Sequence, residues 1–508
     1  MRNSLKSRYL FKLGTNFLVV PLNLISISVI TRALGPELFG QYKYLIYFFT
    51  LIASFIGFGG NYFNTELSKD NFNKTLISFY QNFILLSWFG GALMVLVIGY
   101  AGWTSAFFPD IVEIRYIWIA FVLSFVTFIS QVLESMTDSC GLTENASIFN
   151  FLSKLLGVGA LCTLVFLFNL TNLPAVFLYS FSIAVLTITG FSIILKVGRI
   201  PIFYFRISTK EFKANFYSFF TYSHPLLLLS IFSLVFGFFN RWILQYFSGS
   251  LQMGYFSLSD TFSAFIIIFS NSFIPLLHRD LAINFNERDL ERMKILFQKS
   301  LMIFTAITSY LSAFIFLNIT FITSLIGGVT FEDSIHTSQI MLLYPIAYIA
   351  NNILYAVLYA TGKTPVLRNV QIFIVVLNSI TTYFLVAPTS GFGLQLGAFG
   401  FAISMVLVTY LNHFILLKYC GLFFDLSWVS IVINYLKIII VFLSGAVLST
   451  FLFSLIFKSS LLGFLLSGFF YTIITAYLLF RFPGLVFFST NETEMISRLV
   501  FKFLKKDK

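Results

Sequence analysis

Apolar residues recur along this chain in runs of about twenty, separated by short polar segments. A bilayer core about 30 Å thick needs about 20 apolar residues per helix, and several runs carry no charge over that length. The pattern predicts an all-α integral membrane protein. We expect about fourteen transmembrane helices, at residues 13–34, 41–60, 76–101, 116–136, 148–169, 174–195, 219–240, 252–277, 300–320, 337–360, 367–387, 396–417, 431–456 and 460–480.

The composition agrees with a membrane protein. Hydrophobic residues make up 58% of the chain and charged residues 10%, against about 25% charged in soluble domains. The net charge of +12 does not indicate nucleic acid, because the basic residues lie in short segments between apolar runs. Cys140, Cys162 and Cys420 are too far apart in sequence to suggest a disulfide framework or a metal site. We expect no cofactor, no metal and no nucleic-acid partner.

The basic residues also predict the orientation in the membrane. If the N-terminus is cytoplasmic, all but five of the 32 basic residues fall in inner segments or at inner span ends, as the positive-inside rule requires. We therefore predict a bacterial inner-membrane protein with both termini in the cytoplasm. The basic, amphipathic inner loops 196–218 and 278–299 are expected to lie on anionic lipid.

A faint internal repeat links the first and seventh predicted spans. Each contains an early proline, an arginine towards its outer end, two glycines five residues apart and a tyrosine. These residues are Pro21, Arg32, Gly35, Gly40 and Tyr42, and then Pro225, Arg241, Gly249, Gly254 and Tyr255. Six spans separate the two units, so they point the same way and indicate two parallel halves.

Basic side chains and a histidine within the spans are candidate functional residues, because a charge in the hydrocarbon region costs about 2.5–3.5 kcal/mol. Arg32 and Arg241 each end the first helix of a half. They either snorkel to the outer interface or form a cationic wall in a cleft that binds substrate. His224, just before Pro225, is either a packed polar residue or a proton carrier, since histidine titrates near neutral pH.

Acidic side chains within the spans are candidates for ion coupling. Asp260 lies well inside the eighth predicted span, with no basic residue on its own helix face; burial favours the neutral form of a carboxylic acid, which suits a proton carrier. Glu134 and Asp138 are one helical turn apart at the inner end of the fourth span, and Lys154 near the start of the fifth can pair with either. This group is either an inner-face salt bridge or a coupling site, with Lys154 as a substrate contact.

Two segments resemble the O-antigen (Wzx-type) polysaccharide flippases of the MATE-like superfamily, the multidrug/oligosaccharidyl-lipid/polysaccharide exporters. The first is Thr31–Tyr42 (TRALGPELFGQY). The second runs from Pro225 through Arg241 to Gly254-Tyr255-Phe256-Ser257 and Pro275. Asn240 stands where the family commonly has an aspartate before the arginine, so an ion pair there is not carried over.

The resemblance implies two pseudo-symmetric six-helix lobes around a central cleft. The expected divisions are 1–215 (N-lobe, spans 1–6), 216–420 (C-lobe, spans 7–12) and 421–508 (spans 13–14 and a basic tail). It also implies a function, which is to move undecaprenyl-diphosphate-linked oligosaccharide from the cytoplasmic to the periplasmic leaflet by alternating access. Membrane lipids, a polysaccharide polymerase and a chain-length regulator are the expected partners.

Other functions stay open at this point. A membrane-embedded polysaccharide polymerase would need a long outer loop with catalytic arginines, and the predicted outer loops are short. A multidrug exporter of the same superfamily would usually have twelve spans, and a peptidoglycan-precursor flippase a more charged cleft. The chain has no GxSxG, HExxH or CxxC motif, and Gly362-Lys363-Thr364 lacks the upstream glycine of a phosphate loop. We therefore expect a transporter and not an enzyme.

Overall fold

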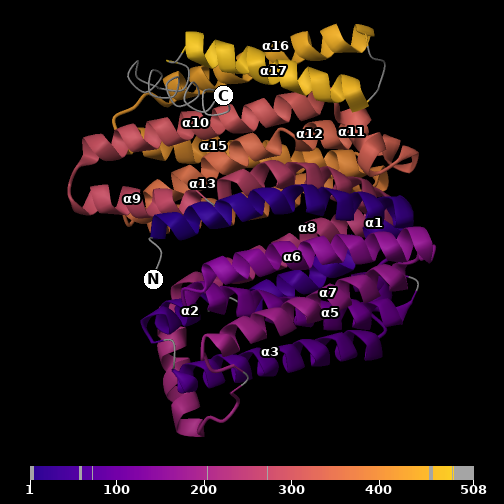
Figure 1. Ribbon diagram of the computed structural model, residues 1–508, viewed down its shortest axis with the longest axis vertical. Coiled ribbons are helices and arrows are strands. Elements are labelled where there is room, and N and C mark those ends of the chain that lie inside the picture. The colour runs from indigo at the N-terminus through magenta and orange to yellow at the C-terminus, as the bar shows by residue number, and fades with distance from the viewer. Residues whose placement is uncertain are drawn as a thin grey trace, which may run out of the picture. The chain divides into compact units, whose positions relative to one another are not determined.

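The computed structural model describes residues 5–56, 60–70, 73–111, 113–202, 204–271, 273–456, 461–482 and 484. These residues form helices and no strand (Figure 1), which confirms the all-α prediction. The helices are α1 (Leu5–Ile56), α2 (Gly60–Lys69), α3 (Lys74–Tyr100), α4 (Thr104–Phe107), α5 (Ile114–Ser139), α6 (Thr143–Cys162), η2 (Thr163–Leu167), α7 (Leu173–Val197), α8 (Thr209–Asn271), α9 (Ile274–Asn286), α10 (Leu290–Leu317), α11 (Ile319–Ile326), η3 (Val329–Ser334), α12 (Ile335–Met341), α13 (Tyr344–Ala360), α14 (Thr364–Val386), η4 (Thr389–Gly391), α15 (Gly397–Phe423), α16 (Trp428–Ile456) and α17 (Leu461–Arg481).

The chain is a multi-pass membrane protein. Within the described residues, eleven helical stretches are long and apolar enough to cross a bilayer. Large apolar side chains point outward from them: Leu86 and Phe89 on α3 and Leu156 on α6 are 63%, 64% and 63% exposed. Such side chains are stable in lipid and would be costly in water. The finer count of fourteen spans stays a prediction.

Polar residues mark where several helices begin. Asn73, Asn172 and Asp289 each stand just before a helix, and each side-chain oxygen accepts a hydrogen bond from the backbone N–H three residues on. This cap satisfies one of the backbone donors that a helix start leaves open. Pro174 follows Asn172 in the first turn of α7, where its missing N–H costs nothing.

The described chain divides into two compact units. The first comprises residues 1–257, 326–331 and 379–400, and the second 258–325, 332–378 and 401–508. In the first unit α5 packs along α7 and α1 along α6, and in the second α10 packs against α13 and α16, while α16 pairs with α17. The predicted lobe boundaries stay a prediction.

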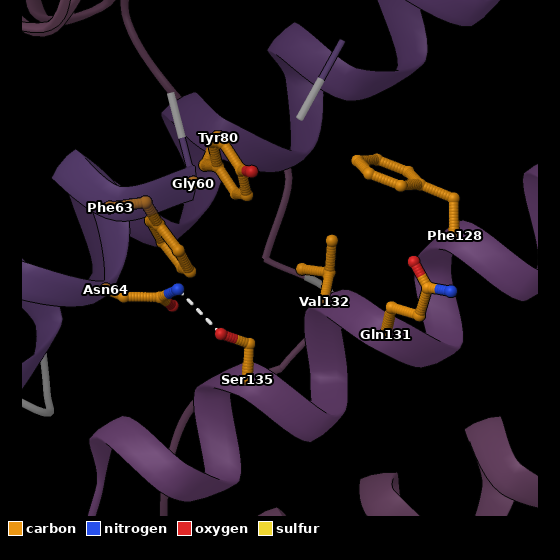
Figure 2. A pocket seen from close by; sticks show the side chains of 8 residues that line it. All are labelled: Gly60, Phe63, Asn64, Tyr80, Phe128, Gln131, Val132 and Ser135. Atoms are coloured by element: carbon orange, nitrogen blue, oxygen red, sulfur yellow. Dashed lines mark hydrogen bonds between the residues drawn. The ribbon is translucent and has the colours of Figure 1, made fainter. Parts of the chain in front are cut away.

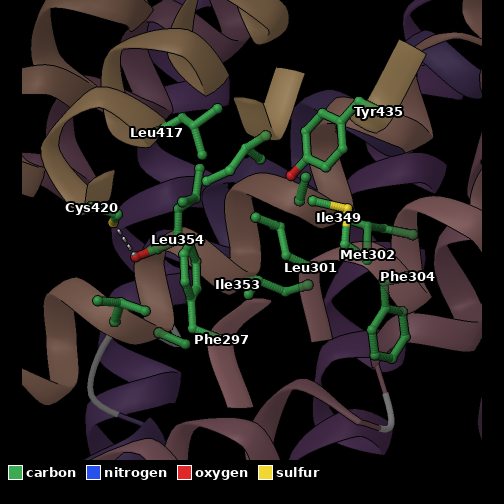
Figure 3. Close-up of a cluster of buried hydrophobic side chains, with 14 of the residues drawn as sticks. Phe297, Leu301, Met302, Phe304, Ile349, Ile353, Leu354, Leu417, Cys420 and Tyr435 are labelled. Atoms are coloured by element: carbon green, nitrogen blue, oxygen red, sulfur yellow. Dashed lines mark hydrogen bonds between the residues drawn. The ribbon is translucent and has the colours of Figure 1, made fainter. Parts of the chain in front are cut away.

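The second unit has a continuous apolar core (Figure 3). Phe297 and Leu301 from α10, Ile353 and Leu354 from α13, and Tyr435 from α16 are all buried there. In a membrane, lipid is as apolar as leucine, so close packing and not water exclusion holds such helices together. The core therefore gives α10, α13 and α16 a fixed arrangement.

The helices α1 and α8 are each broken at one glycine. Gly35 has φ 68° and ψ 175° inside α1, and Gly249 has φ 78° and ψ 176° inside α8. This backbone region is essentially restricted to glycine. The two glycines are the first of each pair in the sequence repeat, so the repeat encodes two equivalent helix breaks.

The second glycine of each pair lets α1 and α8 touch. A Cβ atom on Gly40 would overlap the carbonyl oxygen of Ser250, and one on Gly254 would overlap the carbonyl oxygen of Pro36. Pro36 and Ser250 are the residues that directly follow the two breaks. The contact is therefore reciprocal between the two copies of the sequence repeat.

Candidate functional site

A cavity of about 130 Å³ lies in the first unit, between α2, α3 and α5 (Figure 2). It combines four polar side chains with apolar and aromatic ones. Its lining residues are Gly60, Phe63, Asn64, Tyr80, Phe128, Gln131, Val132 and Ser135. None of these eight is charged.

The walls of this cavity are held by specific contacts. The Asn64 Nδ2 donates a hydrogen bond to Ser135 Oγ over 2.6 Å, which ties α2 to α5. The rings of Phe63 and Tyr80 stack at 4.2 Å between centroids with 12° between their planes. A Cβ on Gly60 would lie 3.2 Å from the Tyr80 hydroxyl oxygen, so the glycine leaves space for that hydroxyl.

A charged group lies on α1, α5 and α6 of the same unit. Lys12 Nζ is 2.5 Å from the Asp138 carboxylate, and both side chains are partly exposed. Asn150 Nδ2 donates to the Glu134 carboxylate over 3.2 Å. Lys154 is partly buried and interacts electrostatically with Glu134. The group contains two basic and two acidic side chains, so its charges balance.

Three of the predicted site residues therefore come together, namely Glu134, Asp138 and Lys154. Sequence reasoning missed Lys12, which lies 126 residues before Asp138. Asn150 was also missed. Its position four residues before Lys154, on the same helix face, is the signal that could have found it.

The two repeat arginines have different surroundings. Arg32 is exposed on α1, beside Gly328, and the preceding Thr31 hydroxyl donates to the carbonyl oxygen of Ile326 over 2.9 Å. Arg241 is partly buried on α8, with its guanidinium carbon 3.6 Å from the centre of the Tyr47 ring. Their roles in substrate binding stay predictions.

The connection between α3 and α5 holds α8 on both sides of the break at Gly249. The Trp242 Nε1 donates to the carbonyl of Ala106 over 2.6 Å, and Gln245 Nε2 donates to that of Pro109 over 3.0 Å. The Asp110 carboxylate accepts the backbone N–H of Ser250 over 3.1 Å. Ser250 follows the break at Gly249, so Asp110 caps the helix segment that restarts there.

The other two ion-coupling candidates, Asp260 and His224, lie on α8. Asp260 lies on α8 in the second unit and is partly exposed. The side chain of His224 lies outside the described residues. Both stay predictions.

The second unit contains a buried polar network that the sequence did not single out. Asn351 Nδ2 donates to the carbonyl of Thr409 over 3.2 Å, which leaves its oxygen to accept from His413 Nδ1 over 3.1 Å. Nearby on the same helices, Asn412 Nδ2 donates to the Tyr355 hydroxyl over 2.7 Å. His413 is 2% exposed, and its Nε2 has no hydrogen-bond partner among the described residues. The network joins α13 to α15 without any charged side chain in these bonds.

Solved structures place the fold in a class of transporters. An inward-facing multidrug resistance MATE family transporter of the MOP superfamily matches with a TM-score of 0.62 and 14% identity, over 82% of this chain and 98% of its own. The lipid II flippase MurJ, in an inward closed conformation, matches with a TM-score of 0.62 and 13% identity, over 92% of this chain and 98% of its own. A MOP superfamily transporter from Pyrococcus furiosus matches with a TM-score of 0.56 and 13% identity, over 83% of this chain and 97% of its own. This chain therefore shares the fold of these three proteins.

The family follows from the sequence itself. A family model described as "Polysaccharide biosynthesis protein" matches residues 9–277, more than half of the 508 residues. This chain therefore belongs to that polysaccharide biosynthesis family. The match covers both glycine pairs of the repeat and confirms the resemblance inferred from them. No curated protein matches the chain in sequence.

Proposed function

We propose that this protein flips undecaprenyl-diphosphate-linked oligosaccharide, an O-antigen or capsule repeat unit, from the cytoplasmic to the periplasmic leaflet by alternating access. The family match over residues 9–277 carries the proposal, because it joins polysaccharide biosynthesis to a transporter fold. The likeness to a lipid II flippase over 92% of this chain supports it.

Arg32, Arg241 and Lys154 are the proposed contacts for the diphosphate. A guanidinium presents a planar fork of donors that matches phosphate oxygens, whereas an ammonium acts as a point charge. Arg32 is exposed on α1. Arg241 would exchange its place over the Tyr47 ring for a phosphate during transport.

Ion coupling is proposed to involve Glu134 and Asp138, with Asp260 and His224 as further carriers. Protonation of Asp138 would weaken its ion pair with Lys12, which joins α5 to α1 at 2.5 Å. Uptake of an ion at this group can therefore change how these two helices are held together.

The decisive test is transport in vesicles. Purified protein in proteoliposomes should move a fluorescent undecaprenyl-diphosphate oligosaccharide between leaflets, measured by its accessibility to a membrane-impermeant quencher. Arg32→Ala and Arg241→Ala should slow flipping, with only partial rescue by lysine. Arg115→Ala is the matched control, because Arg115 is an exposed arginine paired with Glu113.

Two outcomes would overturn parts of the proposal. Export of cationic drugs without flipping of lipid-linked sugar would make the protein a multidrug exporter. An unchanged response of both Asp260→Asn and Asp138→Asn to an imposed pH gradient would remove proton coupling through these residues.

The proposed orientation has its own test. Reporter domains fused after Lys508 and inserted in the 196–218 loop should both read as cytoplasmic, since the basic residues gather on that side. A periplasmic signal at either position would contradict the predicted topology. Contacts with a polymerase and a chain-length regulator stay a prediction.

A further inference from the structure

We propose that the cavity between α2, α3 and α5 is a subsite for one uncharged sugar ring. The inference rests on the proposed function and adds to it the part of the cargo that this cavity recognises. The proposal rests on the lining of this cavity, where neutral hydrogen-bonding side chains lie beside a pair of stacked aromatic rings (Figure 2).

The cavity is large enough for such a ligand. One water molecule needs about 10–15 Å³ of such space, whereas this cavity offers about 130 Å³. Figure 2 shows the side chains of Tyr80, Asn64 and Gln131 lying around this space. The space therefore suits a group of several heavy atoms with polar edges.

The polar groups fit hydroxyl groups better than ions. The carboxamides of Asn64 and Gln131 each offer both donors and an acceptor, and the Tyr80 and Ser135 hydroxyls can do either. Neighbouring hydroxyls on a sugar ring also donate and accept at once. A diphosphate would require arginine or lysine, and a cation would require carboxylates, but no lining residue carries a charge.

The structure leaves part of this capacity unused. Asn64 donates one amide hydrogen to Ser135 Oγ. Ser135 accepts in this bond, so its own hydroxyl proton can still be donated to a ligand. Gln131 is exposed and makes no hydrogen bond with any other described residue. Its whole amide group is therefore available to a ligand.

The remaining walls suit the apolar side of a sugar ring. Phe63 stacks on Tyr80 at one side, and Phe128 and Val132 lie on α5. The C–H groups of a sugar ring are apolar, and aromatic side chains bury such surface well. Lys69 and Lys74, which flank the turn between α2 and α3, place this end of the helices on the predicted cytoplasmic side. This is the side from which the proposed cargo is loaded.

Saturation-transfer NMR on the protein in nanodiscs tests the proposal, with the methyl glycosides of glucose, galactose, mannose and N-acetylglucosamine as probes. At least one should bind, and Gln131→Ala should weaken its binding by about tenfold, the loss expected for a hydrogen-bonding side chain. Val132→Phe, which fills the cavity while keeping every polar group, should abolish binding. Thr127→Ala is the control, because Thr127 is exposed one turn away on α5 and does not line the cavity.

The subsite is disproved if no probe binds, if Gln131→Ala and Val132→Phe bind as the parent does, or if inorganic diphosphate displaces the sugar. Gel filtration of each variant shows whether it is folded. The sugar-binding test and the flipping test can fail independently. Flipping without sugar binding would disprove the subsite alone. Sugar binding that depends on Gln131, without flipping, removes the proposed transport and leaves the subsite.

Discussion

The breaks in α1 and α8 have nearly the same backbone conformation but different surroundings. Gly35 and Gly249 have nearly the same φ and ψ. No described atom lies within 4 Å of a Cβ built on Gly35, whereas one on Gly249 would be 2.8 Å from the Asp110 carboxylate. The repeat has therefore kept the break itself, while the Asp110 carboxylate packs against the break in α8.

The side chains beside the two breaks also differ in their surroundings. Arg32 is exposed, while Arg241 lies over the Tyr47 ring. Trp242, Gln245 and the backbone of Ser250 are bonded to the connection between α3 and α5. The connection between α3 and α5 therefore holds α8 around its break, whereas Thr31 joins α1 to the carbonyl oxygen of Ile326.

The largest expected effect comes from the contact that the repeats share. Alanine at Gly40 or Gly254 would place a Cβ on a backbone carbonyl oxygen of the other helix, and only separation of the helices relieves that overlap. We expect each substitution to cost about 3 kcal/mol or more, seen as loss of monodisperse protein in gel filtration and a lower Tm.

Gly90→Ala is the matched control for this prediction. Gly90 is a helical glycine of α3 with no atom near its Cβ position, so alanine there should be neutral or stabilising by up to about 1 kcal/mol. Normal folding of Gly40→Ala and Gly254→Ala would mean that α1 and α8 do not pack through these glycines.

The second prediction compares the stability lost when alanine replaces the glycine at each break. Gly35→Ala and Gly249→Ala both force alanine into a backbone region that costs about 1–3 kcal/mol. Gly249→Ala should be the more destabilising, because its new Cβ also meets Asp110. Thermal unfolding of both variants measures the difference.

A double-mutant cycle sharpens this comparison. Asp110→Ala should reduce the extra cost of Gly249→Ala and leave the cost of Gly35→Ala unchanged, since Asp110 contacts only the α8 break. Equal effects of Asp110→Ala in both backgrounds would show that the α8 break is not braced by this carboxylate.

The third prediction concerns the two arginines. Arg241→Ala should lower stability by about 1 kcal/mol, the usual worth of a cation–π contact, whereas Arg32→Ala should change it less because Arg32 is exposed. Thermal unfolding in detergent measures both. Tyr47→Leu should remove the effect of Arg241→Ala; full additivity of the two changes would exclude the ring as the partner.

The sequence predicted the helices better than the contacts between them. The all-α fold followed from hydropathy, and the internal repeat marked the glycine pairs, but the helix breaks and the close approach at these glycines are findings of the structure. The rotation of each helix about its axis is not visible in hydropathy. Lys12 and Asp138 could therefore not be paired from the sequence.

The neutral polar residues were missed for a different reason. A search of the spans for charges finds Arg32 or Asp260, because an unpaired charge in lipid is costly. Asn64, Gln131 and Ser135 carry no charge and are common in helices that hydrogen-bond to each other. Only the structure shows that they surround one cavity.

The smallest expected effect lies at the first turns of α1 and α8. The Ser208 hydroxyl and its backbone N–H both donate to the Glu211 carboxylate, at 2.7 and 3.0 Å, and Glu211 N–H donates back to Ser208 Oγ. This is a capping box at the start of α8, whereas the first turn of α1 has no acidic residue.

Acidification should therefore loosen the first turn of α8. The hydrogen bonds from the Ser208 hydroxyl and backbone lower the pKa of Glu211 from its ordinary value. A carboxyl group with a lowered pKa in the folded state adds stability above its ordinary pKa and loses it as pH falls through the folded value. Hydrogen exchange at the first turn of α8 should accelerate as the pH falls below the ordinary pKa of a glutamate, after correction for intrinsic rates. Glu211→Gln, which keeps the shape without the charge, should abolish this pH dependence; if it persists in that variant, the capping box is not its source.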